Sequence, residues 1–549
     1  MARGGQSGGR AAAQGRARQR ATPAGAAGPS ELYSESEGSV DEGHGHEEAN
    51  RGADDTHGAE QAGDRAESNA SAEQRQEAAR RWREQWSSQD AAGGDEEFAQ
   101  PTFPPPRMLL AGEEPAEGWD AIDAVTVEEC IANPCWMHDD IPAQFLTAYC
   151  RVRRDIYAFL LSAYMAQDPL QLERALKWNL ACNAIFCRRK GKGGRRGTPL
   201  EARRYDQWRN LQRGTLVAVW LRDRATALAK IARLKSGGVA PPLDDAKRVQ
   251  QAIELVHDGC LSRAQARLGS AGLLDCADPA VRAKLQGIHG ARSKPMSDEP
   301  PPEGERLVVL LREACRTARR RTAAGPGGGR NEYLRVLGME HSDDRAKEAI
   351  DQMEEYAELF INGDFPSWYY VAAMAARLVP IGKKARTVQE ATAAVPPMRP
   401  ITCGDRDLAV IMGQMMTSLR PAFTSYLVPQ QLCVGVKGAA EIIVHGIRTT
   451  VEHWPNKVVL VLDIKKAYPS VQRATIAERL RKVPDIGNYP RLFDALNKSG
   501  RVLYTDRAGT RLFEEGTEGR LADADEGVGQ GLATSTADFC VGVHDEVKQ

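Results

Sequence analysis

Residues 458–468 read Val-Val-Leu-Val-Leu-Asp-Ile-Lys-Lys-Ala-Tyr, and this stretch decides the predicted fold. Its first five residues are all β-branched or aliphatic, which is typical of a strand that is buried on both faces. Asp463 stands at the end of that strand, and Tyr468 follows it. Hard divalent ions prefer carboxylate oxygens on a rigid support, so a strand that ends in aspartate is a candidate metal-binding element. Taken alone the pattern is weak, because aspartates at strand ends are also common as helix caps.

Helical patterns precede this strand. The spacing of apolar residues predicts helices over 406–427 and 439–452. The predicted buried face of the second helix comprises Ala440, Ile443, Val444, Ile447 and Val451. Further helices are expected over 307–321 and 332–337, on either side of a Gly-rich break. Helices combined with a strand predict an α+β fold for the C-terminal half.

The rest of the chain divides by composition. Residues 1–105 are rich in Gly, Ala, Arg, Glu, Ser and Gln and have few side chains able to form a core, which predicts a disordered low-complexity tail. Residues 107–292 have mainly helical periodicity, and a loop rich in Pro and Glu separates them from a third region, 306–549. Within the helical region we expect helices over 144–166, 205–234 and 245–258. The predicted buried face of the last helix comprises Val249, Ala252, Ile253 and Val256.

The formal net charge of −1 hides a segregation of charge along the chain. Residues 188–196 form a basic run that would make a positive patch able to hold phosphates or act as a nuclear import signal. A solvated loop is an equally open interpretation. The candidate nucleic-acid-binding residues in this run are Arg188, Arg189, Lys190, Lys192, Arg195 and Arg196.

Eleven cysteines without paired spacings, and an N-terminus without an apolar signal segment, favour a reducing, intracellular setting. No apolar run approaches the roughly 18 residues needed to span a bilayer, so a membrane protein is not expected. Cys130, Cys135 and His138 lack a fourth ligand and the short cysteine spacing of zinc sites, which favours a structural role. Cys182 and Cys187 are predicted core residues.

Other motifs occur in a fixed order around Asp463. Before it come Arg377–Lys384, Arg399-Pro400-Ile401, Pro429-Gln430-Gln431, Gly435–Glu441 and His445, and after it comes Glu526–Gly531. Together they resemble the reverse transcriptase of non-LTR (LINE-like) retrotransposons, from about Gly325 to the end of the chain. Residues 324–334 look like the glycine-rich segment that leads into the fingers of such enzymes. The region before it, including 188–196 and 261–264, is similar to the N-terminal part of some of these proteins.

The resemblance implies the fingers and an incomplete palm of a right-hand polymerase over 306–549, preceded by the helical domain and the tail. It implies an RNA-directed DNA polymerase that transfers nucleotides by a two-metal mechanism with Mg²⁺. The implied partners are an RNA template, a DNA primer or target, and deoxynucleoside triphosphates, and the implied location is the nucleus.

Individual roles follow from the same resemblance. Asp463 would be the first metal-binding, catalytic aspartate of the palm, and Tyr468 would be the gate against ribonucleotides. Lys383, or its neighbour Lys384, and Arg399 would contact the triphosphate of the incoming nucleotide. Gln530 and Gly531 would position the template and the incoming base.

The chain departs from the family pattern in two places. Leu532-Ala533-Thr534 follows the Gln-Gly pair, where the family more usually has a small or acidic residue, proline and leucine. The family's catalytic Asp-Asp pair is not found before Gln549, and neither Asp538, expected within a helix, nor Asp545 belongs to an aromatic-x-Asp-Asp turn. We therefore expect the chain as given, without that pair and the thumb, to be inactive alone.

Two rival expectations stay open. One is a non-enzymatic nucleic-acid-binding protein derived from a decayed retroelement, and the other is a helical scaffold with accidental motif matches. The sequence does not decide which RNA or DNA is bound, whether the element is active, or the oligomeric state.

Overall fold

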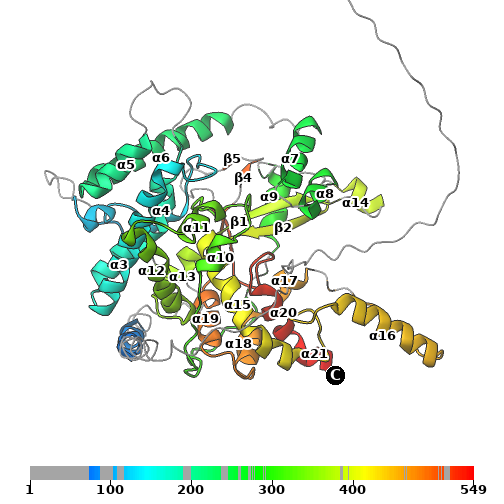
Figure 1. Ribbon diagram of the computed structural model, residues 1–549. Coiled ribbons are helices and arrows are strands. Elements are labelled where there is room, and N and C mark those ends of the chain that lie inside the picture. The colour runs from blue at the N-terminus through cyan, green and yellow to red at the C-terminus, as the bar shows by residue number, and fades with distance from the viewer. Residues whose placement is uncertain are drawn as a thin grey trace, which may run out of the picture. The chain divides into compact units, whose positions relative to one another are not determined.

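The computed structural model describes residues 73–86, 103–107, 117–189, 200–235, 245–257, 261–269, 274, 276, 278–288, 290, 292–383, 388–393, 395–462, 464, 466–504, 506–507, 510–511 and 520–548. Within these ranges the protein is mainly helical and has a small mixed sheet (Figure 1). The coarse part of the fold prediction, helices combined with a few strands, is confirmed.

The helices of the N-terminal part match the predicted pattern in most places. They are 73–86, η1 (Trp119–Ile122), α2 (Val127–Ile131), η2 (Ala143–Phe145), α3 (Leu146–Met165), α4 (Pro169–Phe186), α5 (Leu200–Arg209), α6 (Arg213–Lys235), α7 (Asp245–His257), α8 (Leu261–Gly269) and α9 (Pro279–Gln286). The single helix predicted over 205–234 is instead two, α5 and α6, because the chain turns at Leu211 with a φ of +59°.

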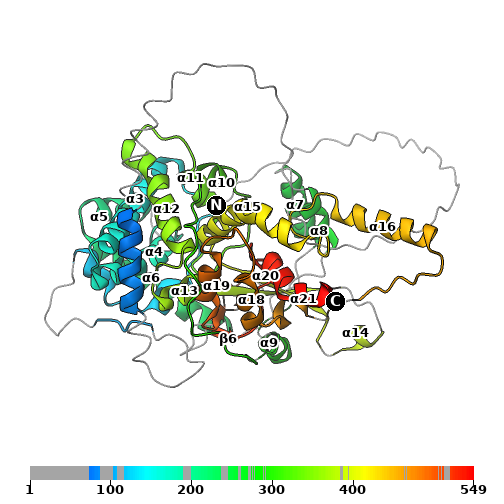
Figure 2. The same ribbon diagram turned by 90° about the horizontal axis from the view of Figure 1, so that it is seen from below.

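The first helix corrects the predicted disorder of 1–105. Residues 73–86 are helical, and Trp82 is fully buried with its Nε1 donating to the Tyr164 carbonyl over 2.9 Å. Ala78 and Ala79 are also buried, and Trp86 stacks on Trp82, so a short apolar stripe docks this helix. Figure 2 shows the helix lying along the others. The prediction used the average composition of residues 1–105, which does not reveal so short a stripe. The other predicted tail residues, except 103–105, lie outside the described ranges.

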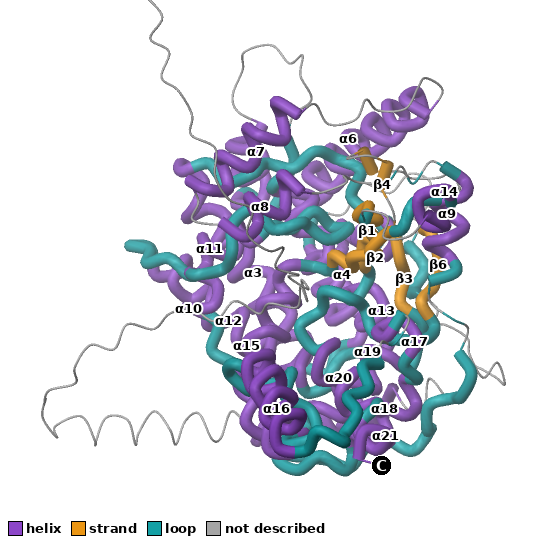
Figure 3. The backbone as a smooth tube through the Cα atoms, turned by 90° about the vertical axis from the view of Figure 1, so that its right-hand side faces the viewer, coloured by secondary structure: helices purple, strands orange, loops and turns teal. Residues whose placement is uncertain are grey.

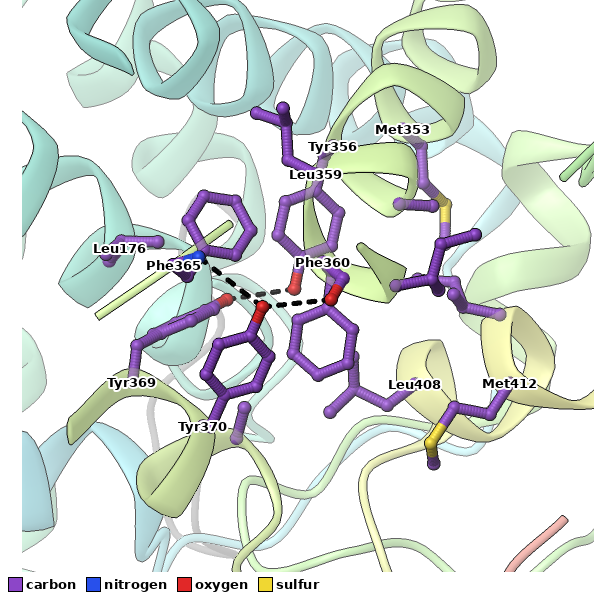
Figure 4. Packing of buried hydrophobic residues seen from close by; sticks show 14 of the residues in the cluster. Leu176, Met353, Tyr356, Leu359, Phe360, Phe365, Tyr369, Tyr370, Leu408 and Met412 are labelled. Atoms are coloured by element: carbon purple, nitrogen blue, oxygen red, sulfur yellow. Dashed lines mark hydrogen bonds between the residues drawn. The ribbon is translucent and has the colours of Figure 1, made fainter. Parts of the chain in front are cut away.

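A single core joins the two regions that the sequence separates at 292–306. It combines α3 and α4 with α10 (Arg312–Arg316), α11 (Asn331–Leu337), α12 (Asp344–Ile361) and α13 (Ser367–Ala373). At its centre the hydroxyls of Tyr356 and Tyr369 are hydrogen bonded over 2.9 Å, and the Tyr370 hydroxyl donates to the Phe360 carbonyl (Figure 4). The regions 107–292 and 306–549 thus belong to one compact unit.

The sheet lies against this core with the order β2-β1-β3-β6. Its strands are β1 (Ala376–Gly382), β2 (Met398–Cys403), β3 (Arg501–Tyr504) and β6 (Arg520–Ala524), and the short α14 (Val388–Thr392) joins the first two (Figure 3). β1 pairs antiparallel with β2 and parallel with β3, and β3 pairs antiparallel with β6. A separate two-stranded ladder comprises β4 (Asp506–Arg507) and β5 (Thr510–Arg511).

Seven further helices follow β2 in the described part of the chain. They are α15 (Arg406–Leu427), α16 (Ala439–His453), α17 (Ala467–Ser470), α18 (Arg473–Leu480), α19 (Tyr489–Asn497) and α20 (Ser535–Gly542), with α21 (His544–Lys548) after them. The helix predicted over 406–427 is confirmed, and Asp405 caps it by accepting from the Asp407 amide over 2.9 Å. No helix among the described residues is long and apolar enough to cross a membrane.

The predicted strand over 458–462 is wrong. This stretch has no regular structure, and Val458 and Val461 are 89% and 84% exposed. A strand buried on both faces needs a neighbour for its backbone hydrogen bonds. None of the four strands in the described sheet lies beside these residues.

Two predicted helix faces are also exposed. The helices α7 and α16 form where the sequence predicts them, but Val249, Ile253 and Val256 of α7 are exposed, and α16 has no buried residue. Both ribbon views show α16 extending away from the other helices (Figure 1, Figure 2). The apolar stripes thus predicted both helices correctly. Of the residues predicted to be buried on them, Ala252 of α7 is buried and the others are not.

The helix predicted over 307–321 is reduced to α10. In the first part of this segment, backbone amides donate to side chains and not to the carbonyls of a helix. The Leu307 amide donates to Asn362 Oδ1 over 2.9 Å, and the Leu311 amide donates to Glu354 Oε1 over 2.6 Å. The helix predicted over 332–337 is confirmed as α11.

Candidate functional site

The β1–β2 hairpin carries the two predicted triphosphate contacts on one face. Burial alternates along β1, and the buried side, which includes Leu378, packs on Val281 and Leu285 of α9. Ile381 pairs directly with Arg399 across the hairpin, so both belong to the other face. The Lys383 amide donates to the Pro397 carbonyl over 2.8 Å and extends this pairing.

If the same alternation continues past the end of β1, Lys383 belongs to the face of Arg399. Lys383 is exposed and Arg399 is half-buried. These two cations then lie on one surface. Lys384, the alternative to Lys383, lies outside the described residues.

The segment that contains Gln530 and Gly531 lies against β2. The Thr402 amide donates to the Gln530 carbonyl over 2.9 Å. Gly531 has a φ of +105°, and a Cβ atom there would lie 3.1 Å from the Thr402 carbonyl oxygen. Both the conformation and the close approach require glycine. The predicted Gln-Gly pair is thus placed on the strand that bears Arg399.

Tyr468 lies on the other side of the same segment. The Val528 amide donates to the Tyr468 carbonyl over 2.9 Å, and the Tyr468 hydroxyl is 3.2 Å from Thr536 Oγ1 of α20. The tyrosine ring packs on Phe539 with 5.4 Å between ring centroids. The loop 527–531, which contains Gln530, is therefore hydrogen bonded to Tyr468 and to β2, the strand that bears Arg399.

Arg473 holds this loop in place and was not predicted from the sequence. Its side chain is 1% exposed and donates to the carbonyls of Gly527 over 2.9 Å and Ala524 over 2.7 Å. Its amide donates to Glu526 Oε1 over 2.7 Å. Burial and the nearby Arg501 and Arg292 lower the pKa of the Arg473 guanidinium to about 9. Nothing in the sequence near Arg473 indicates this role, since all its partners are distant in the chain.

Asp538 has a structural role in α20. Its carboxylate accepts from the Tyr489 hydroxyl over 2.6 Å, and burial raises its pKa to about 7. A buried carboxyl that is held by a tyrosine is not available to a metal ion. The expectation that Asp538 does not replace a catalytic aspartate agrees with this geometry.

The basic run requires a correction at its first residue. Arg188 is 1% exposed, and its Nε donates to Asp223 Oδ2 over 2.9 Å. Arg188 is therefore a buried structural residue and not part of a solvent-facing patch, because its side chain pairs with a residue of α6. Arg189 is exposed and pairs with Asp139 over 2.7 Å. Lys190, Lys192, Arg195 and Arg196 lie outside the described residues.

The predicted magnesium ligand, Asp463, also lies outside the described residues. In the described part of the chain, no group of three or more His, Cys, Asp or Glu side chains could hold a metal ion. The described residues therefore do not fit a magnesium site by themselves. Cys130 and Cys135 are buried, as are Cys182 and Cys187, in line with the structural roles expected for all four.

A small cavity lies apart from this site. It has a volume of about 40 Å³ and is lined by the start of α15, the glycine-rich segment and α4, including Asp405, Gly327 and Asn183. This is room for a few water molecules and not for a nucleotide. Burial, together with the neighbouring Asp407, raises the pKa of Asp405 to about 7. We assign the cavity no role in binding.

The sequence matches no protein-family model, and a comparison with curated proteins gives no match.

Proposed function

We propose that this chain binds a nucleic-acid template and an incoming deoxynucleoside triphosphate as the fingers and part of the palm of an RNA-directed DNA polymerase. The observation that supports this most is the hydrogen bond between the Thr402 amide and the Gln530 carbonyl. It joins two motifs that are far apart in the chain and that the family resemblance assigns to one nucleotide.

Each residue has a part that suits its chemistry. Lys383 offers a point charge and Arg399 a planar fork, and both fit the oxygens of a triphosphate. The loop 527–531 would position the incoming base, and the adjacent ring of Tyr468 would lie under its sugar. Template binding would depend mainly on phosphate contacts and on the shape of the duplex, and would therefore weaken as salt rises.

Magnesium enters this proposal only through the resemblance. Asp463 would be a ligand in a complete enzyme, but the described residues provide no site for the ion. The proposal therefore covers binding and positioning, and no catalytic step is derived.

A second candidate is a nucleic-acid-binding protein without enzymatic activity. The two candidates differ in one measurable respect: only a polymerase site should bind nucleic acid more tightly in the presence of the complementary nucleotide.

The test uses the full 549-residue chain and a fluorescent RNA–DNA hybrid with a recessed DNA 3′ end. Anisotropy titrations are made with Mg²⁺ and either the complementary or a non-complementary deoxynucleoside triphosphate. We expect tighter binding with the complementary nucleotide alone. Lys383→Ala or Arg399→Ala should reduce that gain by about tenfold, since a hydrogen bond to a charged group contributes roughly 1.5–3 kcal/mol.

Lys347→Ala is the matched control, because Lys347 is an exposed cation on α12 that pairs with Asp344 over 2.8 Å. Its effect should be small. Binding that depends on salt but not on the nucleotide would favour the non-enzymatic candidate. Binding that is independent of salt would contradict both.

A further inference from the structure

Two cysteine sulfur atoms approach each other closely beside the candidate site. Cys433 Sγ, in the loop between α15 and α16, is 3.1 Å from Cys540 Sγ in α20. Both thiols are free, and Cys433 is exposed whereas Cys540 is buried. A disulfide bond is about 2.0 Å long, so the two sulfur atoms need to approach by only about 1 Å.

The loop around Cys433 is held by side-chain hydrogen bonds on both sides of that residue, to α20 and α21 before it and to α15 after it. Gln431 Nε2 donates to the Cys540 carbonyl over 2.8 Å and lies 3.1 Å from His544 Nδ1. Thr424 Oγ1 donates to the Val434 carbonyl over 3.1 Å. These hydrogen bonds hold the residues on either side of Cys433 in place, and so keep its sulfur atom close to that of Cys540.

The electrostatics of the pair differ from those of the other cysteines. The hydrogen bond between the two sulfur atoms lowers the pKa of Cys433 to about 7 and, together with burial, raises that of Cys540. Burial instead raises the pKa of Cys130, Cys150 and Cys315 to about 12. A thiolate is the nucleophilic form of cysteine, so Cys433 combines exposure with reactivity near neutral pH.

We propose that Cys433 and Cys540 form an oxidisable dithiol, a modification site at which a peroxide converts the pair into a disulfide bond between the 428–438 loop and α20. Cys433 is the residue that meets the oxidant, and Cys540 is the resolving residue behind it.

The reaction has two balanced steps. The Cys433 thiolate attacks one oxygen of hydrogen peroxide, which breaks the O–O bond and gives a sulfenic acid and hydroxide. The Cys540 sulfur then attacks the sulfenic sulfur, and the departing hydroxide leaves as water with the Cys540 proton. Two thiols are oxidised by two electrons, one peroxide is reduced, and a thiol reductant reverses the change.

The bridge would constrain the chain over a sequence separation of 107 residues. That span includes Tyr468, the loop 527–531 and the start of α20. A cross-link over such a length restricts mainly the unfolded chain, and the oxidised protein should unfold at a temperature about 5 °C higher. This chemistry needs none of the nucleotide-binding residues.

The experiment treats the reduced full chain with one equivalent of hydrogen peroxide at pH 7.5. Remaining thiols are then blocked with N-ethylmaleimide, and the non-reduced digest is mapped by mass spectrometry across all eleven cysteines. We expect one main cross-linked product that contains Cys433 and Cys540, and its loss on treatment with dithiothreitol. With Cys540→Ser, dimedone should label Cys433 as a stable sulfenic acid.

With Cys433→Ser, an exposed substitution, the circular dichroism spectrum should not change and Cys540 should stay a blocked thiol. A main product that joins Cys433 to another cysteine, or two copies of Cys433 from different chains, would overturn the proposal. So would unchanged thiols in the wild-type chain, or an equal yield of bridged product from a chain unfolded in urea.

Discussion

The backbone amide of Thr402 donates to the carbonyl of Gln530 over 2.9 Å, and through this bond the strand that bears Arg399 is joined to the loop beside Tyr468. On the other side of the loop, the Val528 amide donates to the Tyr468 carbonyl over the same distance. The Arg473 side chain donates to the carbonyls of Ala524 and Gly527, and so holds the start of the loop and the residues before it. The candidate site is therefore held by backbone contacts, and its geometry should be sensitive to glycine substitutions.

Gly531→Ala should destabilise the protein by about 1–2 kcal/mol, because a residue with a Cβ atom is strained at positive φ. The new methyl group would also press on the Thr402 carbonyl. Urea unfolding measures the change. Gly446→Ala is the control, since Gly446 lies within the exposed α16 with open space around it, and alanine should not destabilise a helix there. Equal stability of the two variants would contradict the assigned loop geometry.

Trp82→Ala should cost about 3–5 kcal/mol, because it removes a fully buried indole from the core. The helix over 73–86 should then be cut by trypsin at Arg80 or Arg81 well before the rest of the unit unfolds. Trp454→Ala, at a position 57% exposed, should change stability little. Resistance of the Trp82 variant to trypsin at these two arginines would mean that this helix does not depend on Trp82.

The positions of helices could be predicted better than the segments against which each element packs. The helix over 406–427 follows from sequence alone because Asp405 supplies an N-cap and the apolar side chains recur at helical spacing. In contrast, the stretch 458–462 has every local feature of a buried strand and is exposed, because burial depends on a neighbour that local sequence does not specify. Strand propensity is a property of one segment, whereas a sheet forms only where at least two strands pair.

In the candidate site, too, the sequence predicted some residues and missed the contacts that depend on distant parts of the chain. Motif order singled out Arg399, Gln530 and Tyr468, and their roles stay predictions. The structure shows backbone hydrogen bonds from Thr402, in the strand of Arg399, to Gln530 and from Val528 to Tyr468. Arg473 was missed, since its carbonyl partners lie more than fifty positions further along the chain. Arg188 was assigned to a basic patch from its neighbours in sequence, but its own side chain is paired with Asp223 inside the fold.

Arg188→Ala should therefore lower stability by about 2 kcal/mol, because it leaves the Asp223 carboxylate without its partner and opens a buried space. RNA affinity of the folded variant should be unchanged. Arg189→Ala, next to it but exposed, should have little effect on stability. If Arg188→Ala instead lost RNA binding and kept its stability, Arg188 would be part of the basic patch after all.

Stability should fall as pH rises through the titration of Asp538. Burial raises its pKa to about 7 in the folded protein, from the ordinary aspartate value of 3.8. Between these values the folded state holds a proton that the unfolded state has released, so each increase in pH favours unfolding. Asp538→Asn keeps an acceptor for the Tyr489 hydroxyl and cannot ionise.

The variant should gain stability over the wild type as pH rises, by a few kcal/mol at most at pH 8, since one pKa unit corresponds to about 1.4 kcal/mol. Thermal unfolding of both proteins at pH 5 and pH 8 measures this. A difference between them that is the same at both values would show that Asp538 does not titrate in this range.

The most direct measurement of the central claim, that the β1–β2 hairpin and the loop 527–531 form one nucleotide-binding surface, is photocrosslinking. The full chain is irradiated with a base-azido deoxyuridine triphosphate, an RNA–DNA hybrid with a templating adenine and Mg²⁺, and the labelled peptides are sequenced. The account predicts labels within 528–536 or at Tyr468, removed by excess unmodified deoxythymidine triphosphate and reduced by Arg399→Ala. Labels confined to the helices of 144–235, or labels that the competitor does not remove, would contradict it.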